Sequence, residues 1–212
     1  MKALVLALTL AIGASASAGV LTTTPSKKTI EGVTVAASAT ATVDGNNLSL
    51  TTVGAGLRTK KVLIAKVKVY VATLLATDPG AFARKDGQAL GSLASQSGAA
   101  IQLTFLRGVD AATVQSSFKE ALTANNVSLN KSEINAFLKA VAASGDARDG
   151  KTLTIAYAST ANGDSIVYEG TEGAATTVRG PKGFAKDIFS IWLGNPSDNG
   201  VAELKTQLLQ PL

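Results

Sequence analysis

The stretch GAGLRTKKVLIAKVKVYVATLL, residues 54–75, decides how this chain folds. Two glycines and an arginine precede a long apolar run that contains four lysines and one tyrosine. The β-branched run predicts a long strand, or a pair of strands, over residues 61–76. Because side chains of a strand alternate between its faces, Lys66, Lys68 and Tyr70 share one face, and the other face is apolar except for Thr73. The apolar face belongs to a core, and the mixed face is either solvated or the floor of an amphipathic cleft.

The glycines at the start of this stretch allow a second interpretation. Gly54-Ala55-Gly56 resembles part of a dinucleotide-binding loop. Such a loop needs a third glycine and a following helix, whereas the next residues are β-branched and rich in lysine. We therefore expect no nucleotide at this position.

The composition excludes several classes of function. The 212 residues are 46% hydrophobic and 17% charged, which fits one folded domain. A net charge of +5 with only 5% aromatic residues gives no reason to expect nucleic acid as a partner. The chain has no histidine and no cysteine, so it lacks the usual zinc ligands, disulfides and histidine bases. We expect neither a metal nor any other cofactor.

The N-terminus has the layout of a secretory signal. Lys2 is followed by an apolar run and then by small residues that end at Ala18. We interpret residues 1–18 as a cleaved signal peptide, and a buried first helix is the alternative. The apolar run is too short to span a bilayer, so we expect a periplasmic or secreted protein without a membrane span. Residues 19–29 contain polar residues and a proline and are expected to form a flexible leader, which leaves residues 30–212 as the domain.

The remaining strands are predicted from alternation and turn signals. A hairpin follows Ile30 and turns at Asp44–Asn47, and a buried strand is expected at 99–107. Residues 78–96 are expected to be a loop with a weak helix. Three further strands form a meander, at 151–160, 164–170 and 174–180.

Apolar stripes at helical spacing predict four helices between and after these strands. Asp110 is expected to cap the first, Asn130 with Glu133 to form a capping box for the second, and Pro181 to begin the third. The last helix carries Val201, Leu204 and Leu208. The order of elements favours an α+β fold in which an antiparallel sheet has its helices on one side.

Four segments of the chain resemble the chalcone isomerase-like family: GAGLR, VKVYVATLL, LTFLRGVDAATVQSSFKEAL and GPKGFAKDIFSIWLG with LKTQLL after it. The resemblance runs from about Ile30 to the C-terminus, and the secreted, histidine-free form is similar to the bacterial branch of that family. It implies an open-faced β-sandwich, in which a large antiparallel sheet carries a layer of helices and a ligand cleft lies between them.

The resemblance also implies which residues line the cleft. The catalytic arginine of the family matches Arg58, and four further polar positions of the cleft fall at Tyr70, Val114, Ala121 and Ala185. Valine and alanine can neither orient a catalytic water nor hydrogen-bond a ketone. Chalcone isomerase activity is therefore not expected.

Fatty-acid-binding members of the same superfamily hold the ligand carboxylate with an arginine and a tyrosine of this segment. Arg58 and Tyr70 resemble that pair, so our first hypothesis is a protein that binds a fatty acid or a similar apolar carboxylate, with Val114, Ala121 and Ala185 along the acyl chain. The second is an intramolecular lyase for a phenolic substrate, with Arg58 as electrophile and Tyr70 as proton relay. The third is a scaffold with a filled cleft, in which Arg58 makes only a structural ion pair.

One step in this interpretation comes from the family pattern alone. Arg58 and Tyr70 would lie about 40 Å apart on an unbroken strand. They can share a ligand only if the chain reverses between Thr59 and Ala65, and no strong turn signal stands there.

Overall fold

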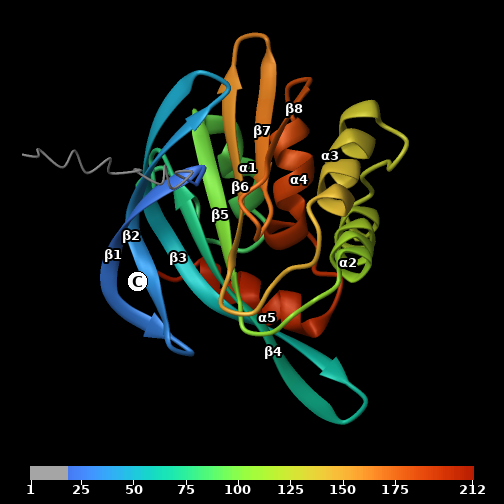
Figure 1. Cartoon of the computed structure of the whole chain (residues 1–212). Coiled ribbons are helices and arrows are strands. Elements are labelled where there is room, and N and C mark those ends of the chain that lie inside the picture. Colours follow the sequence, from blue (N-terminus) through green and yellow to red (C-terminus); the bar gives the residue numbers. More distant parts are fainter. Residues whose placement is uncertain (1–18) are drawn as a thin grey trace, which may run out of the picture.

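A computed structural model describes residues 19–212, so the expected signal peptide lies outside the described residues. The chain forms an eight-stranded antiparallel sheet in which every strand pairs with its neighbours in the sequence (Figure 1). The strands are β1 (Leu21–Ile30), β2 (Val33–Val43), β3 (Asn46–Val62), β4 (Ala65–Ala76), β5 (Gly98–Phe105), β6 (Thr152–Thr160), β7 (Gly163–Glu169) and β8 (Ala175–Gly180).

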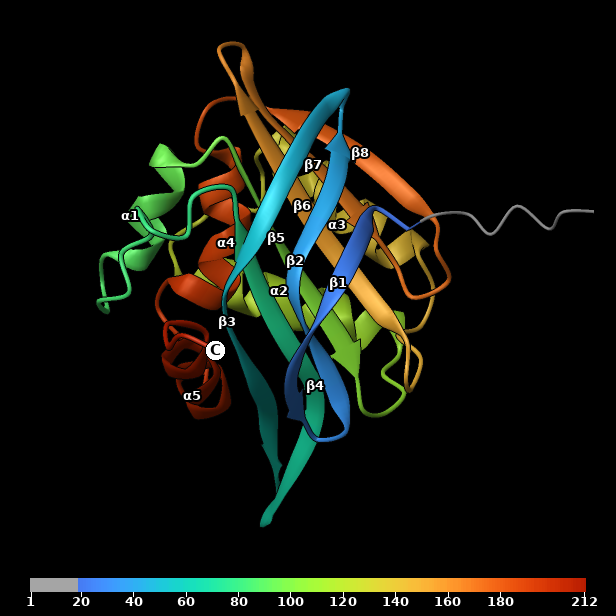
Figure 2. The ribbon, with the colours of Figure 1, turned by 90° about the vertical axis from the view of Figure 1, so that its left-hand side faces the viewer.

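The helices lie on one side of this sheet, as Figure 2 shows with the strands β1 and β2 nearest the viewer. They are α1 (Ala89–Ser92) with the 3-10 helix η1 (Leu93–Ser95), α2 (Ala111–Ala124), α3 (Ser132–Ala143), α4 (Phe184–Leu193) and α5 (Asn199–Leu208). Within residues 19–212 no helix is long and apolar enough to cross a membrane. The predicted α+β fold, a large antiparallel sheet with helices on one side, is confirmed.

The apolar residues form two clusters, one on each face of the central strands. The larger cluster lies between sheet and helices and includes Trp192, Phe118 and Phe137. The smaller cluster is rich in alanine and lies where the sheet curls so that β2 packs over β4, β6 and β7. From Val71 to Ala76, β4 is therefore buried on both faces. The sequence predicted one apolar and one mixed face, and this part of the strand differs from that prediction.

The flexible leader expected at residues 19–29 is instead mostly strand β1. It pairs with β2 from Leu21 to Ile30, with irregular register between Thr24 and Thr29. Pro25 is tolerated because β1 is the edge strand, where one side of the backbone needs no ladder partner. The folded body therefore begins near Leu21 rather than at Ile30.

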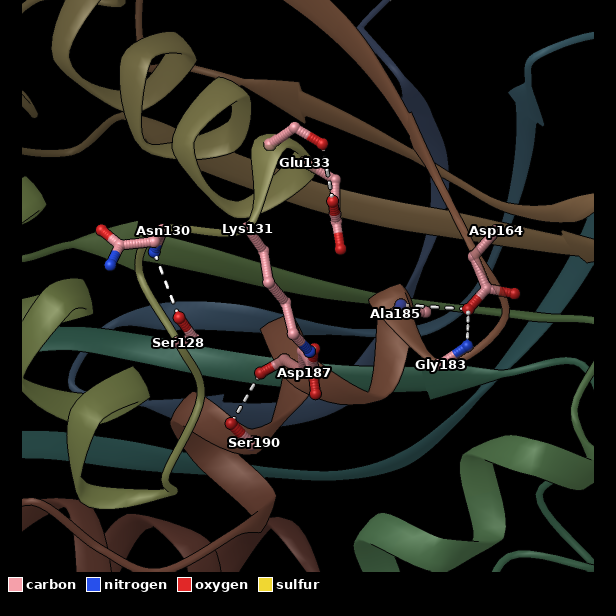
Figure 3. A network of polar contacts seen from close by, with 10 residues as sticks. Ser128, Asn130, Lys131, Glu133, Asp164, Gly183, Ala185, Asp187 and Ser190 are labelled. Carbon is pink, nitrogen blue, oxygen red and sulfur yellow. Dashed lines mark hydrogen bonds and ion pairs between the residues drawn. The ribbon is translucent and has the colours of Figure 1, made fainter.

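The caps of the helices agree with the sequence in one case and differ in two. The Asp110 carboxylate accepts from the Thr113 N–H at 2.7 Å, so this cap is confirmed. The capping box at Asn130 is wrong: α3 begins after Lys131 without a side-chain cap, and the Asn130 N–H donates to Ser128 Oγ (Figure 3). Pro181 does not begin α4 but lies in the turn before Gly183, the residue that precedes the helix.

Candidate ligand-binding pocket

Arg58 and Tyr70 lie directly opposite each other on the antiparallel strands β3 and β4. The chain reverses between them in a tight hairpin turn at Leu63 and Ile64. The turn had no signal in the sequence because Leu63 adopts φ +55°, a conformation that usually favours glycine or asparagine. A register shift just after the Arg58–Tyr70 pair skips Val69, and such a bulge increases the local twist of the hairpin.

Gly54 and Gly56 allow α5 to lie directly against β3. A Cβ atom on Gly54 would stand 2.5 Å from the carbonyl oxygen of Gln210, and one on Gly56 would stand 2.5 Å from Cβ of Gln207. Gln207 Oε1 also accepts from the backbone N–H of Leu57 at 2.8 Å. The two glycines are thus packing positions and not part of a phosphate-binding loop.

The close approach of α5 brings Asp198 to Arg58. Asp198 caps α5 by accepting from the Val201 N–H at 2.9 Å, and its other oxygen accepts from Arg58 Nη2 at 2.6 Å. Gly200 makes this contact possible, because any side chain there would overlap the Arg58 guanidinium and the Thr59 carbonyl group. Arg58 is only 8% exposed and also donates to the Thr59 carbonyl oxygen.

The charge of Asp198 is stabilised in this position. Partial burial raises the pKa of Asp198, but the hydrogen bonds from the Val201 N–H and the Arg58 guanidinium outweigh that effect and hold the pKa below its ordinary value. Asp198 is therefore a carboxylate at neutral pH, and Arg58 already has an anionic partner.

The Tyr70 hydroxyl is held by a second helix. It accepts from the indole N–H of Trp192, in α4, at 3.1 Å, and the Tyr70 ring packs edge-to-face on Phe105 with centroids 5.5 Å apart. Burial raises the pKa of Tyr70, so the phenol keeps its proton at neutral pH. Among the described residues its proton has no hydrogen-bond acceptor, so the group can donate to a ligand.

A pocket of about 300 Å³ opens beside these residues, between the hairpin β3–β4, strand β5 and the helices α2, α4 and α5. Its apolar wall comes from Val62, Val67, Val69, Leu103, Phe105, Val109, Val114, Phe118, Ala121, Ile191 and Val201. Its polar lining comes from Arg58, Lys60, Tyr70, Arg107, Asp110, Thr113, Ser117, Glu120, Ser197 and Asp198. Four of the five residues that the family resemblance indicated, Arg58, Tyr70, Val114 and Ala121, line this single pocket.

Ala185 does not line this pocket. It lies in the first turn of α4, is buried in the main core, and donates its backbone N–H to Asp164 Oδ2 at 3.1 Å. Figure 3 shows the same carboxylate accepting from the Gly183 N–H. Ala185 thus belongs to the buried first turn of α4, which Asp164 caps, and not to the pocket.

Sequence reasoning missed Asp198, Trp192 and Arg107. Asp198 carried a local signal, since aspartate before Asn-Gly suits a helix N-cap, but its pairing with Arg58 spans 140 residues. Trp192 gives no signal in the sequence beyond its apolar character, although its indole N–H orients Tyr70. Arg107, which is exposed on the loop after β5, lines the pocket and forms no ion pair within residues 19–212.

The fold and the pocket together define an open-faced β-sandwich with a pocket between its sheet and its helices. The family model described as chalcone isomerase-like matches residues 27–210, so the chain belongs to the chalcone isomerase-like family. Among solved structures, it is similar to that of the Arabidopsis thaliana fatty-acid binding protein AtFAP1, with a TM-score of 0.59 and 17% sequence identity over 84% of this chain and 94% of that one. No match was found among curated proteins.

Proposed function

We propose that this protein binds a fatty acid or a similar apolar carboxylate in the pocket and has no chalcone isomerase activity. The observation that carries the proposal is the direct pairing of Arg58 with Tyr70 at the edge of a pocket whose wall is mainly aliphatic and aromatic. The similarity in fold to a protein named for fatty-acid binding supports it.

The two polar residues suit a carboxylate for different reasons. The Arg58 guanidinium presents a planar fork of donors, and the protonated Tyr70 hydroxyl adds one more. The acyl chain would lie along Val114, Phe118 and Ala121, where each buried methylene contributes about 0.8 kcal/mol. The volume of about 300 Å³ is at the small end of ligand pockets, which favours a slender ligand.

Asp198 competes with such a ligand, because its carboxylate already occupies Arg58. The ion pair is what the scaffold hypothesis expects, but the pocket beside it is not filled. The Asp198 side chain is 39% exposed, so it can turn toward solvent when another carboxylate takes its place. Binding would then exchange one carboxylate for another at Arg58, and removing the charge of Asp198 should strengthen it.

The lyase hypothesis is less well supported by the same residues. Val114 and Ala121 place aliphatic groups in the pocket at positions where the family resemblance implies polar residues. Tyr70 keeps its proton and is therefore a poor general base. We expect no turnover when a chalcone is added to the protein, and measurable ring closure that depends on Arg58 would favour the lyase instead.

The test is native mass spectrometry of the purified protein, followed by titration with palmitate. Arg58→Met keeps most of the side-chain volume and should weaken binding roughly ten- to hundredfold, since it removes a charge-assisted hydrogen bond. Asp198→Asn should strengthen binding, because asparagine still caps α5 but no longer competes as an anion.

Arg148→Met is the matched control, since it removes an arginine whose ion pair with Glu172 lies outside the pocket. Equal affinities for the wild type, Arg58→Met and Arg148→Met would refute Arg58 as the anchor. A wild type that carries no acid and ignores added palmitate would refute the binding function altogether.

We also propose that the chain acts outside the cytoplasm, as in the secreted bacterial branch that it resembles. The support is the sequence of residues 1–18 alone. The intact mass of the protein isolated from its host should correspond to a chain that begins at Gly19. A mass that includes residues 1–18 would contradict the proposal.

A further inference from the structure

The tip of the β3–β4 hairpin exposes three large apolar side chains side by side. Val62 is 50% exposed, Leu63 is 90% exposed and Ile64 is 98% exposed. Figures 1 and 2 show from two directions that this hairpin extends beyond the rest of the molecule. We call Val62, Leu63 and Ile64 the hairpin tip.

The hairpin tip is not the choice that local folding favours. Two other tight turns join the first strands: Glu31–Gly32 between β1 and β2, and Asp44–Gly45 between β2 and β3. Each is a polar residue followed by glycine, and both residues have positive φ. At the tip a leucine adopts φ +55°, which costs an L-residue with a large side chain about 1 kcal/mol. Neither folding nor solubility accounts for Leu63 and Ile64 in this place.

Lysines surround the hairpin tip. Lys60 and Lys61 precede it and Lys66 and Lys68 follow it, and the chain carries no acidic residue between Gly45 and Asp78. Lys66 pairs with Glu203, and Lys68 pairs with Glu31.

We call these four lysines the basic collar. Within residues 19–212, Lys60 and Lys61 form no ion pair, so the basic collar keeps a positive charge even though Lys66 and Lys68 are paired. An apolar tip with a basic collar is complementary to an anionic lipid surface: the apolar groups enter the interface, and the ammonium groups meet the lipid phosphates.

We propose that the hairpin tip docks this protein on anionic lipid membranes. The hairpin above the tip continues into the wall of the pocket, since Lys60, Val62 and Val67 line it. Docking would therefore place the pocket next to the bilayer, into which the acyl chain of a fatty acid partitions. The docking itself does not depend on the proposed ligand, so each proposal can fail without the other.

Flotation with vesicles tests the docking. The probes are vesicles of phosphatidylcholine alone and of phosphatidylcholine mixed with phosphatidylglycerol, and the variant is Leu63→Asn with Ile64→Gly. Asparagine tolerates the positive φ at position 63 and glycine tolerates any φ at position 64, so the variant should keep the fold of the wild type. The two proteins share the same N-terminus, so residues 1–18 cannot account for a difference between them.

The wild type should float with the anionic vesicles, less with the neutral ones, and less at high salt. The variant should lose at least about tenfold in partition coefficient, because two large apolar groups are removed. Its affinity for palmitate should not change, since neither residue lines the pocket.

A second variant, Ile64→Trp, reports entry into the membrane directly. The added indole should emit at shorter wavelength when anionic vesicles are present, whereas Trp192, which is 1% exposed, should not respond.

Equal flotation of wild type and variant, or an indole at position 64 whose emission does not shift, would overturn the proposal. Self-association of the wild type that the variant loses, without any binding to vesicles, would also overturn it and assign the hairpin tip to contacts between copies of the chain.

Discussion

The two ends of the β3–β4 hairpin reverse the usual relation between side-chain size and burial. At the base, Gly54 and Gly56 are buried without side chains, because backbone atoms at the end of α5 occupy the space beside Gly54 and side chains of α5 occupy the space beside Gly56. At the tip, Leu63 and Ile64 are almost fully exposed. Large apolar residues normally lie inside, so the base is determined by packing within the molecule and the tip points to a contact outside it. Arg58 and Tyr70 lie between these two ends.

The strongest way to break the base is to add one methyl group. Gly54→Ala should lower the free energy of unfolding by about 3 kcal/mol, because the new Cβ would overlap carbonyl oxygens at the end of α5. Urea denaturation would measure this loss. Gly91→Ala in α1, where an added Cβ meets nothing within 4 Å, is the matched control and should be neutral or slightly stabilising. A loss below about 1 kcal/mol at Gly54 would show that α5 moves away from β3 easily.

At the tip, a substitution is expected to raise the free energy of unfolding instead of lowering it. Leu63→Asn should raise the free energy of unfolding by about 1 kcal/mol, since asparagine accepts the positive φ that strains leucine. Thermal denaturation without lipid would measure the gain. A loss of stability would mean that the exposed side chains contribute to the folded state, and it would weaken the contrast between the two ends.

A smaller effect is expected at the pocket between the two ends, where Asp198 meets Arg58. The folded-state pKa of Asp198 lies below its ordinary 3.8, so its contribution is present above pH 3.8 and is lost as the pH falls through the folded-state value. Asp198→Asn should therefore cost stability at pH 7, by less than about 1 kcal/mol because the carboxylate is partly solvated.

Urea denaturation of wild type and Asp198→Asn from pH 7 to pH 3 measures this difference, which should shrink on acidification. A difference that grows toward low pH would mean that Asp198 is not an anion in the folded protein.

The smallest effect is expected where the hairpin meets α5 at the surface. Lys66 and Glu203 form an ion pair at 2.7 Å with both side chains about half exposed. Glu203→Gln should change the free energy of unfolding by less than about 0.5 kcal/mol, and molar salt should remove the difference. A larger, salt-independent loss in chemical denaturation would show that this pair fixes the hairpin against α5.

The periodic elements of this fold were predictable because their signals are local. The meander at the C-terminal half of the sheet and the cap at Asp110 follow from neighbouring residues and agree with the structure. The leader failed as a prediction because the pairing of Leu21–Ile30 with β2 stabilises a polar, proline-containing segment that has no apolar alternation of its own. The capping box at Asn130 failed as a prediction because α3 begins one residue later, after Lys131, and has no side-chain cap.

The candidate site divides in the same way. The residue types in the sequence determined that the chain has no histidine chemistry, that Arg58 and Tyr70 are its candidate anchors, and that Val114 and Ala121 are aliphatic. Only the tertiary structure decided that the chain turns at Leu63, that these four residues share one pocket while Ala185 lies buried in the first turn of α4, and that Asp198 occupies Arg58. The reason is physical: residue identity fixes what a group can do, whereas contacts across 140 residues depend on how closely α5 can approach the glycines of β3.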